Sequence, residues 1–339
     1  MAEFRIGVIG LNFGRHHVRT LANMEEVTLV AVADRVMAER GELAPFAQKY
    51  GAAGYADAVE MLRSERLDAV SICVPPHVRP PLVEYAARHG IPMLIEKPWS
   101  ADLADGGRLA EICRREQATV MLGFSFRYLP AITRLRALLD GELGAGWLLN
   151  GEYLFDWQPP PAHWLWNPQA GNGFFNENSC HLIDAVCYLL GEPESVFAES
   201  ATHRGSPSAE VAAVTLRFAG GAAAALTLGC LGTAAFQHFP RLDLVTENGQ
   251  AHLGGRQHIW ETLAWATRAD TEIHEFTAPP EMLGATRYTA ALTHFVECVR
   301  SGRQPSAGIA DGMRAVAVAI AIDESGRTGR RVPVHSVKE

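Results

Sequence analysis

A histidine flanked by two acids is the first candidate for chemistry in this sequence. Glu177, His181 and Asp184 occur at i, i+4 and i+7, which predicts that all three side chains share one face of a helix over 177–190. A histidine held by a carboxylate can accept a proton near neutral pH. By spacing alone, a structural helix turn with a hydrogen-bonded histidine is the simpler interpretation. His and two acids could also hold a metal, but no second histidine is near in the sequence, and we expect none.

Lys97 is the second candidate. It lies in Glu96-Lys97-Pro98, at the carboxyl end of a strand expected over 92–96. In open α/β sheets this end of the strands faces the ligand crevice. A lysine there can donate a hydrogen bond to a substrate hydroxyl and stabilise a developing alkoxide. A solvated surface lysine paired with Glu96 fits the position equally well.

A glycine-containing turn follows the first expected strand, over 5–10. The run Gly10-Leu11-Asn12-Phe13-Gly14 is one residue shorter than the usual GxGxxG pattern, and Asn12 stands where the second glycine is expected. Asn tolerates positive φ better than other non-glycine residues, so the turn remains possible. A turn of this kind, with a helix expected over 15–23, would bring backbone N–H groups and the positive helix end to a pyrophosphate. Glycines can also simply make a turn.

Asp34 strengthens the interpretation as a dinucleotide site. It ends the next expected strand, 28–34, roughly 20 residues beyond the glycine turn, where an acid would hydrogen-bond the adenosine ribose. An acid here repels a 2′-phosphate and favours NAD, whereas Arg35 beside it could bind that phosphate and favours NADP. We expect NAD as the cofactor, with NADP possible.

An aromatic loop follows at Trp157, Trp164 and Trp166. These side chains could stack on a sugar or cover a nicotinamide ring. Prolines and tryptophans also make rigid packed loops, and the sequence does not decide between the two interpretations.

The hydrophobic pattern supplies the scaffold for these residues. As far as residue 123, continuous apolar strands alternate with helices, which indicates a parallel sheet covered on both faces, a doubly wound Rossmann domain over 1–123. Beyond it, a helix over 131–139 and several strands indicate an α+β domain over 124–339 with a large open, mostly antiparallel sheet. Two helices, over 288–301 and 311–325, close the chain. The expected fold class is therefore α/β with two domains.

Composition limits the partners. A formal net charge of -8 argues against nucleic acid and against an anionic membrane. The start lacks the features of a signal peptide, and no apolar stretch is long enough to span a bilayer. The six cysteines form no CxxC pair, so we expect reduced, mostly buried thiols in a cytoplasmic protein.

Longer motifs show a family resemblance over nearly the whole chain. The sequence resembles the Gfo/Idh/MocA family, the glucose–fructose oxidoreductase and inositol dehydrogenase type. The motifs that carry the resemblance are IGVIGLNFGRHH, VAVADR, LDAVSICVPPH, IEKP, GFSFRYLPAITRLRALLDGELG, GNGFFNENSCHLIDAVCYLLG and ECVRSGRQPSAGIADGMRAVAVAIAIDESGRTGRRVPV. The resemblance implies oxidation or reduction at a carbinol carbon of a sugar, inositol or related polyol. It also implies a homo-oligomer, a dimer or tetramer, formed through the C-terminal sheet.

The resemblance implies roles for single residues. Lys97 matches the lysine that contacts the substrate hydroxyl, and His181 matches the proton-transfer histidine. Glu177 falls where the family usually has Asp, which keeps the carboxylate but lengthens its reach. The candidate cofactor contacts are Gly10, Asn12, Phe13, Gly14, Asp34, Arg35, Val74, Pro75, His77, Glu96 and Lys97, and the candidate substrate contacts are Lys97, Arg127, Trp164, Glu177 and His181.

Three departures from the family pattern surround the expected pocket. Arg79 replaces a frequent histidine, Leu165 stands where arginine is frequent, and Asn172 interrupts a glycine run. Together they leave the substrate unidentified.

The function expected from these residues is NAD(P)-dependent hydride transfer, with Lys97, His181 and Glu177 as catalytic residues. Two alternatives stay open: NAD-dependent, redox-assisted glycoside hydrolysis, and a non-catalytic dinucleotide-binding regulator on the same fold.

Overall fold

A computed structural model describes residues 3–236, 241–256, 259–282 and 286–335. The chain forms two compact units. The first comprises Met1–Gly123 and Tyr288–Gly312, and the second comprises Phe124–Arg287 and Met313–Glu339.

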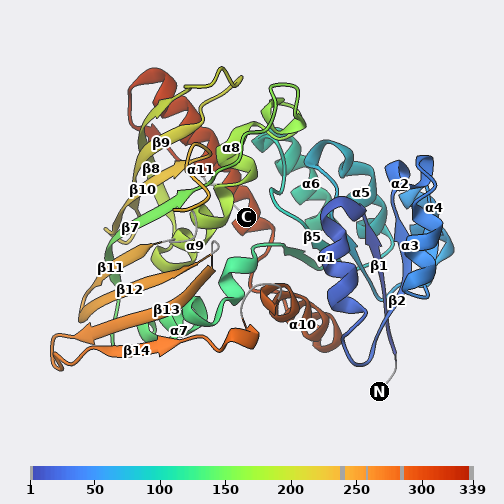
Figure 1. Cartoon of the computed structure of the whole chain (residues 1–339), viewed down its shortest axis with the longest axis horizontal. Coiled ribbons are helices and arrows are strands. Elements are labelled where there is room, and N and C mark those ends of the chain that lie inside the picture. The colour runs from blue at the N-terminus through green and yellow to red at the C-terminus, as the bar shows by residue number, and fades with distance from the viewer. Residues whose placement is uncertain (1–2, 237–240, 257–258, 283–285, 336–339) are drawn as a thin grey trace. The chain divides into compact units, whose positions relative to one another are not determined.

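The first unit is built on a six-stranded parallel sheet with the order β3-β2-β1-β4-β5-β6 (Figure 1). The strands are β1 (Phe4–Ile9), β2 (Val27–Ala33), β3 (Ala53–Tyr55), β4 (Ala69–Ile72), β5 (Met93–Ile95) and β6 (Val120–Leu122). All four residues of β4 and all three of β5 are buried, as expected for parallel strands covered on both faces. This confirms the doubly wound Rossmann-type sheet.

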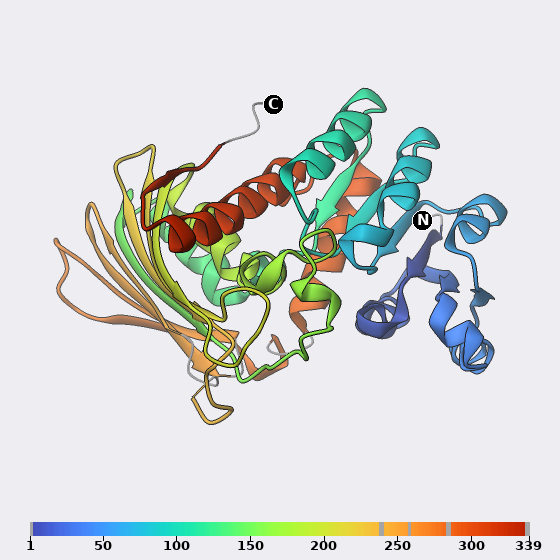
Figure 2. The ribbon, with the colours of Figure 1, turned by 90° about the horizontal axis from the view of Figure 1, so that it is seen from above.

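Helices cover both faces of this sheet; Figure 2 shows α1 on one side and α5 and α6 on the other. The helical segments are α1 (Leu11–Leu21), α2 (Arg35–Glu39), α3 (Leu43–Lys49), α4 (Ala58–Ser64), the 3-10 turn η1 (Pro76–Val78), α5 (Pro80–Arg88), α6 (Leu103–Arg115) and α10 (Thr286–Ser301). Helix α1 buries the stripe Leu11, Gly14, His17, Val18 and Leu21, which follows the helical period.

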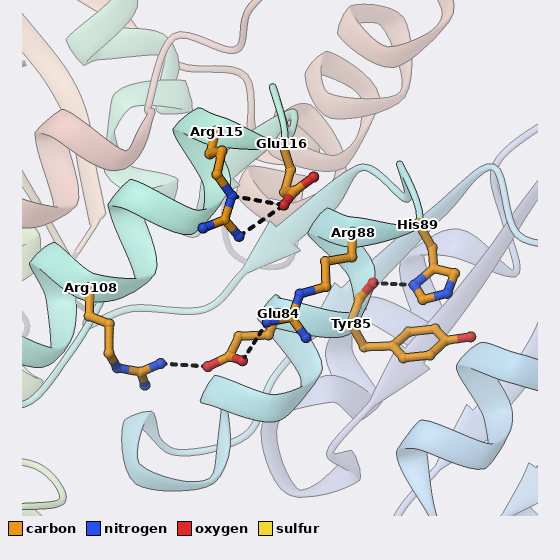
Figure 3. A network of polar contacts seen from close by, with 7 residues as sticks. All are labelled: Glu84, Tyr85, Arg88, His89, Arg108, Arg115 and Glu116. Carbon is orange, nitrogen blue, oxygen red and sulfur yellow. Dashed lines mark hydrogen bonds and ion pairs between the residues drawn. The ribbon is translucent and has the colours of Figure 1, made fainter.

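The outer surfaces of α5 and α6 carry a network of exposed charges (Figure 3). Glu84 pairs with Arg88 in its own helix, at 3.4 Å, and with Arg108 of α6, at 2.5 Å. The Tyr85 ring stacks on the His89 ring with centroids 3.9 Å apart. Solvent screens such pairs, so we expect them to contribute little to stability.

The segment 288–312 belongs to the first unit, so the expected second domain, 124–339, is interrupted. Contacts made by α10 and by the chain after it explain this correction. Tyr288 lies 5.7 Å from the Phe13 ring of α1, and Arg300 pairs with Glu26 at 3.2 Å. The Leu122 amide of β6 donates to the carbonyl of Ala307.

The second unit contains a nine-stranded sheet with the order β14-β13-β12-β11-β7-β10-β9-β8-β15. Only β7 and β10 pair in parallel, and the other neighbours are antiparallel, which confirms the mostly antiparallel sheet. The strands are β7 (Gly146–Leu154), β8 (Pro193–Ala201), β9 (Val211–Phe218), β10 (Ala223–Gly229), β11 (Leu242–Thr246), β12 (Gly249–Arg256), β13 (Ile259–Thr267), β14 (His274–Thr277) and β15 (Val332–Pro333).

The helices of the second unit gather on one face of this sheet (Figure 2). They are η2 (Ser125–Tyr128), α7 (Pro130–Leu139), η3 (Trp164–Trp166), α8 (Gly173–Glu177), α9 (Cys180–Leu190), η4 (Pro280–Met282) and α11 (Ile309–Thr328). The end of α11 lies directly on β8, where Ser325 Oγ accepts from the Ala198 amide at 2.9 Å. On the central strands every second side chain points away from the helices and is exposed, as in β9.

Within the described residues, we find no helix with both the length and the hydropathy needed to cross a membrane.

Candidate active site

Gly10 forms the turn between β1 and α1, and its geometry excludes a side chain. Its φ of 84° lies in the left-handed region. A Cβ atom at Gly10 would lie 2.7 Å from Val74 Cγ1 and 2.9 Å from the carbonyl carbon of Cys73, both of which follow β4. The backbone therefore passes directly over the carboxyl end of β4, which a dinucleotide turn requires.

Asn12 does not take the positive φ that its position suggested. Helix α1 begins at Leu11, four residues earlier than expected, so Asn12 and Phe13 lie in its first turn. The amides of a first helical turn have no acceptor within the helix and can receive an anionic ligand. Gly14 lets this helix pack closely, because a Cβ there would lie 3.0 Å from Val8 Cγ1 and 3.3 Å from Cys73 Cβ.

Asp34 connects the glycine turn to the next helix. Its Oδ2 accepts from the Leu11 amide at 2.7 Å, and its Oδ1 accepts from the Met37 amide at 2.9 Å as the N-cap of α2. The carboxylate is thus fixed at the carboxyl end of β2. Arg35 is exposed beside it and makes only a long contact, 3.8 Å, with Glu39.

The loop after β4 completes this edge of the sheet. Val74 and Pro75 are half-buried, and His77 is exposed on the 3-10 turn η1. Arg79, which the family pattern placed near the pocket, is buried.

Glu96 is engaged by a histidine that the sequence analysis did not select. Its Oε1 lies 3.1 Å from His17 Nε2, and its Oε2 accepts from the Lys97 backbone amide at 3.3 Å. The other ring nitrogen of His17 lies 2.8 Å from Ser71 Oγ. Burial lowers the pKa of His17, but Cys73 and Glu96 outweigh this and hold it well above its usual value. His17 therefore meets one oxygen of the Glu96 carboxylate, and the Lys97 backbone amide meets the other.

Two signals in the sequence could have revealed this arrangement. His17 falls on the buried stripe of α1, where a polar side chain needs a partner. Lys97 is one of few lysines in a chain rich in arginine; the others are Lys49 and Lys338. A lysine retained in such a composition indicates a need for an ammonium group.

The acid and histidine motif lies in the second unit, but not on one helix. The helix expected over 177–190 is broken: Glu177 ends α8, and His181 and Asp184 belong to α9. The amides of Asn178 and Ser179 both donate to the Phe174 carbonyl, which closes α8 before α9 begins. The prediction that one helix face carries all three side chains is therefore wrong.

Asp184 serves a buried ion pair with Arg127. Arg127 Nε donates to Oδ2 at 2.8 Å and Nη2 donates to Oδ1 at 2.5 Å, so both carboxylate oxygens accept from this guanidinium. Both side chains are buried. Beside this pair, the half-buried His181 ring stacks on Phe126 with centroids 4.8 Å apart. The turn η2 thus contacts α9 at two residues: Arg127 pairs with Asp184, and Phe126 stacks on His181.

The tryptophan loop divides into packed and half-exposed rings. Trp166 is buried and donates from Nε1 to the Pro159 carbonyl at 3.2 Å. Trp157 and Trp164 are half-buried and contact the ring of His163, at 5.9 Å and 5.5 Å. Leu165 is fully buried. Only Trp157 and Trp164 therefore keep accessible ring surface.

The six cysteines are buried thiols, not disulfides. Burial raises the pKa of Cys113 and of Cys187 to about 12, which leaves both thiols protonated. Among the described residues, no group of three or more His, Cys, Asp or Glu side chains is arranged to hold a metal ion.

The structure thus brings the expected cofactor residues together in the first unit and the remaining candidate substrate residues in the second. Gly10, Asp34, Val74 and Lys97 follow β1, β2, β4 and β5, which are neighbours in one parallel sheet. The carboxyl ends of parallel strands lie at one edge, and this is where α/β proteins bind dinucleotides. Fold and site together define the class, a Rossmann-type dinucleotide-binding protein.

Comparison with known proteins gives the family. Residues 4–124 match the model of the oxidoreductase family with an NAD-binding Rossmann fold, and residues 132–252 match the GFO/IDH/MocA C-terminal domain. The chain belongs to the Gfo/Idh/MocA family of NAD-binding oxidoreductases.

Curated relatives match over nearly their whole length. The rhizopine catabolism protein MocA of Rhizobium meliloti is 27% identical over 96% of this chain and 95% of its own. The NAD(+)-dependent scyllo-inositol 2-dehydrogenase of Bacillus subtilis is 26% identical over 97% and 96%. Levoglucosan dehydrogenase, solved with NADH and L-sorbose, shares the fold with a TM-score of 0.89 at 20% identity, covering 99% of this chain and 100% of that one.

Proposed function

We propose that this protein transfers hydride between NAD and a carbinol or carbonyl carbon of a sugar, inositol or related polyol. One observation carries the proposal. Lys97 follows β5 at the same sheet edge as the Gly10 turn and the Asp34 carboxylate, and Glu96 and His17 hold its backbone there. An ammonium group at the dinucleotide edge is placed to meet a substrate oxygen.

The residues of this edge fit the cofactor. A Cβ at Gly10 would collide with Val74 and Cys73, and the first turn of α1 would present its amides to a pyrophosphate. The Asp34 carboxylate, fixed by two amides, would accept from the ribose hydroxyls. When bound, the nicotinamide ring accepts or supplies the hydride. Candidate contacts from Asn12, Phe13, Gly14, Arg35, Pro75 and His77 complete the proposed cofactor site.

Three side chains, His181, Lys97 and Glu177, would transfer the proton and bind the substrate oxygen. His181 takes the hydroxyl proton during oxidation and returns it during reduction. Lys97 donates a hydrogen bond to the same oxygen and stabilises negative charge on it. Glu177 positions His181 or a neighbouring hydroxyl.

We propose two further contacts for the rest of the substrate. Trp164, with accessible ring surface, would contact the substrate, and Arg127 would act at the edge of the pocket while its Nε and Nη2 hold Asp184.

Names of relatives support the substrate class. They include inositol dehydrogenases, a D-apiose dehydrogenase and the rhizopine catabolism protein MocA, so the relatives named for a substrate act on a cyclic polyol or a sugar. The buried thiols support a cytoplasmic location. We also propose a homo-oligomer that forms through the open face of the C-terminal sheet.

A substrate screen with substitutions tests the function. We would measure reduced cofactor by absorbance over sugars, inositols and sugar acids with NAD and NADP. With a confirmed substrate, Lys97→Ala and His181→Ala should each lower kcat by about 100-fold or more, because each loses a group that acts on the reacting oxygen. Lys49→Ala and His89→Ala, at exposed sites, are the matched controls.

Three outcomes would contradict the proposal. Near-wild-type turnover in either site variant removes that residue from the mechanism. Free sugar produced from a glycoside with no net NADH indicates glycoside cleavage instead. Tight NAD binding without turnover over the whole panel indicates a regulatory protein.

A further inference from the structure

Arg79 is a buried cation that belongs to none of the roles described above. It lies between η1 and α5, at the end of the loop that follows β4, and only 1% of its surface is exposed. Burying a guanidinium is costly unless its donors meet acceptors. Its partners therefore indicate why this position carries an arginine.

The partners are backbone carbonyls from two loops. Nη2 donates to the Val74 carbonyl at 2.8 Å, just after β4. Nη1 donates to the carbonyls of Pro98 and Trp99, the latter at 3.0 Å, just after β5. The planar guanidinium of arginine carries two terminal nitrogens at fixed angles, so it can donate to carbonyls of two separate loops at once. A lysine ammonium has one nitrogen and cannot reproduce this geometry.

Lys97 lies between two fixed points as a result. On its N-terminal side, Glu96 is held by His17 and accepts from the Lys97 amide. On its C-terminal side, Arg79 holds Pro98 and Trp99, and the Trp99 indole donates to the Gly106 carbonyl of α6 at 3.0 Å. Backbone motion at Lys97 is therefore restrained from both directions.

The pKa of Arg79 is consistent with a guanidinium that is charged when it binds the three carbonyls. Burial lowers the pKa of Arg79 to about 10, against the opposing effect of Glu96 and Cys73. The group stays protonated at neutral pH, and its charge balances the buried Glu96 carboxylate together with His17.

We propose that Arg79 is a positioning residue, which ties the loop after β4 to the loop after β5 and so places the Lys97 ammonium for reaction. The inference rests on the proposed role of Lys97. It does not require Arg79 to touch substrate or cofactor. Arg79 meets the loop after β4 at the Val74 carbonyl, but the Asp34 carboxylate is held by the amides of Leu11 and Met37, so cofactor affinity should depend on Arg79 less than hydride transfer does.

The test compares Arg79→Lys with Arg88→Lys. Arg88 lies on α5 and, among the described residues, pairs with Glu84 at the surface, so its conservative change is the matched control (Figure 3). For Arg79→Lys we expect a fall of about 10- to 100-fold in the single-turnover rate of hydride transfer, because the charge stays but the planar guanidinium is lost. The Kd for NAD should stay within about threefold of wild type. In Arg79→Ala, added guanidinium should restore part of the rate.

A second readout does not need a substrate. Reductive methylation with 13C-formaldehyde labels lysines, and this chain offers only Lys49, Lys97 and Lys338 beside the N-terminus. Comparison with Lys97→Arg, made in the wild type and in each Arg→Lys variant, assigns the Lys97 signal and separates it from the one lysine signal that each variant adds. We expect Arg79→Lys to change the chemical shift and the titration midpoint of that signal, while Arg88→Lys leaves both unchanged.

The outcomes separate the two proposals. Wild-type hydride transfer and an unchanged Lys97 signal in Arg79→Lys would overturn the positioning role. So would a parallel loss of NAD affinity, thermal stability and rate, which is the pattern of general structural support. If no substrate turns over with the wild-type protein, the proposed function fails, and the Lys97 signal still decides the role of Arg79.

Discussion

At the scale of single residues, the Asp34 carboxylate accepts hydrogen bonds from the first residue of α1 and from the first turn of α2. Each oxygen has a second lone pair available in principle for a ribose hydroxyl. This arrangement gives the carboxylate a fixed direction, so its charge can discriminate between cofactors with and without a 2′-phosphate.

Replacing Asp34 should therefore change cofactor choice. We expect Asp34→Ala to weaken NAD binding by about 10- to 100-fold, since a hydrogen bond to a charged group is worth about 1.5–3 kcal/mol. Binding of NADP should weaken less or improve, because a repelling charge is removed. Fluorescence titration of both cofactors measures the ratio. Glu39→Ala, an exposed acid of α2, is the control, and an unchanged ratio in Asp34→Ala would refute this role.

At the scale of elements, the contact between η2 and α9 includes a buried ion pair, Arg127 with Asp184. The Arg127 guanidinium lies over the Tyr188 ring, with Cζ 4.7 Å from the ring centroid, and donates from Nε and Nη2 to the Asp184 carboxylate. The same short turn carries Phe126, on which His181 stacks. The packing of η2 against α9 and the orientation of the His181 ring therefore depend on the same short turn.

Breaking that pair should be costly. Asp184→Asn leaves a buried arginine without its countercharge, and we expect a loss of about 3–5 kcal/mol in the free energy of unfolding of the second unit. The double variant Arg127→Met with Asp184→Leu should recover most of it, because no buried charge remains. Urea denaturation followed by tryptophan fluorescence measures both.

The surface pair of Arg136 and Asp140 provides the comparison for this experiment. Asp140→Asn should change stability little, because solvent screens the pair. An Asp184→Asn variant no less stable than Asp140→Asn would show that the buried pair does not hold the contact between η2 and α9.

At the scale of the whole molecule, the nine-stranded sheet presents one face without helices among the described residues (Figure 2). Its central strands expose Leu148, Asn150, Thr215 and Thr227 at alternating positions, and the next positions along β7 and β9 expose the charged Glu152 and Arg217. The neutral side chains at the centre of this face suit contact with a second copy, because they allow close approach without burying charge there.

A charge at the centre of this face should prevent association. We expect the wild-type protein to elute as a dimer or tetramer in size-exclusion chromatography with light scattering. Thr215→Arg should shift it to the monomer, since two arginines would be buried at a symmetric interface. Glu116→Arg, on the surface of α6, should leave the mass unchanged. A wild-type monomer, or an unchanged mass for Thr215→Arg, would refute the proposed interface.

The sequence by itself determined the order of strands and helices and the residues at one edge of the sheet. Gly10, Asp34 and Lys97 each follow an apolar strand, and parallel strands bring such positions together without further information. Periodicity is a local signal, so it located these elements well. It missed the strand β3, which is only three residues long, and the break between α8 and α9, across which the helical pattern continues.

Only the tertiary structure decided which distant side chains share a contact. His17 meets Glu96, Arg79 meets Pro98 and Trp99, Arg127 meets Asp184, and the segment 288–312 returns to the first unit. Each contact joins positions whose spacing in the chain carries no period. The physical reason is that burial selects partners for charge and hydrogen bonding in space, after the strands and helices have packed.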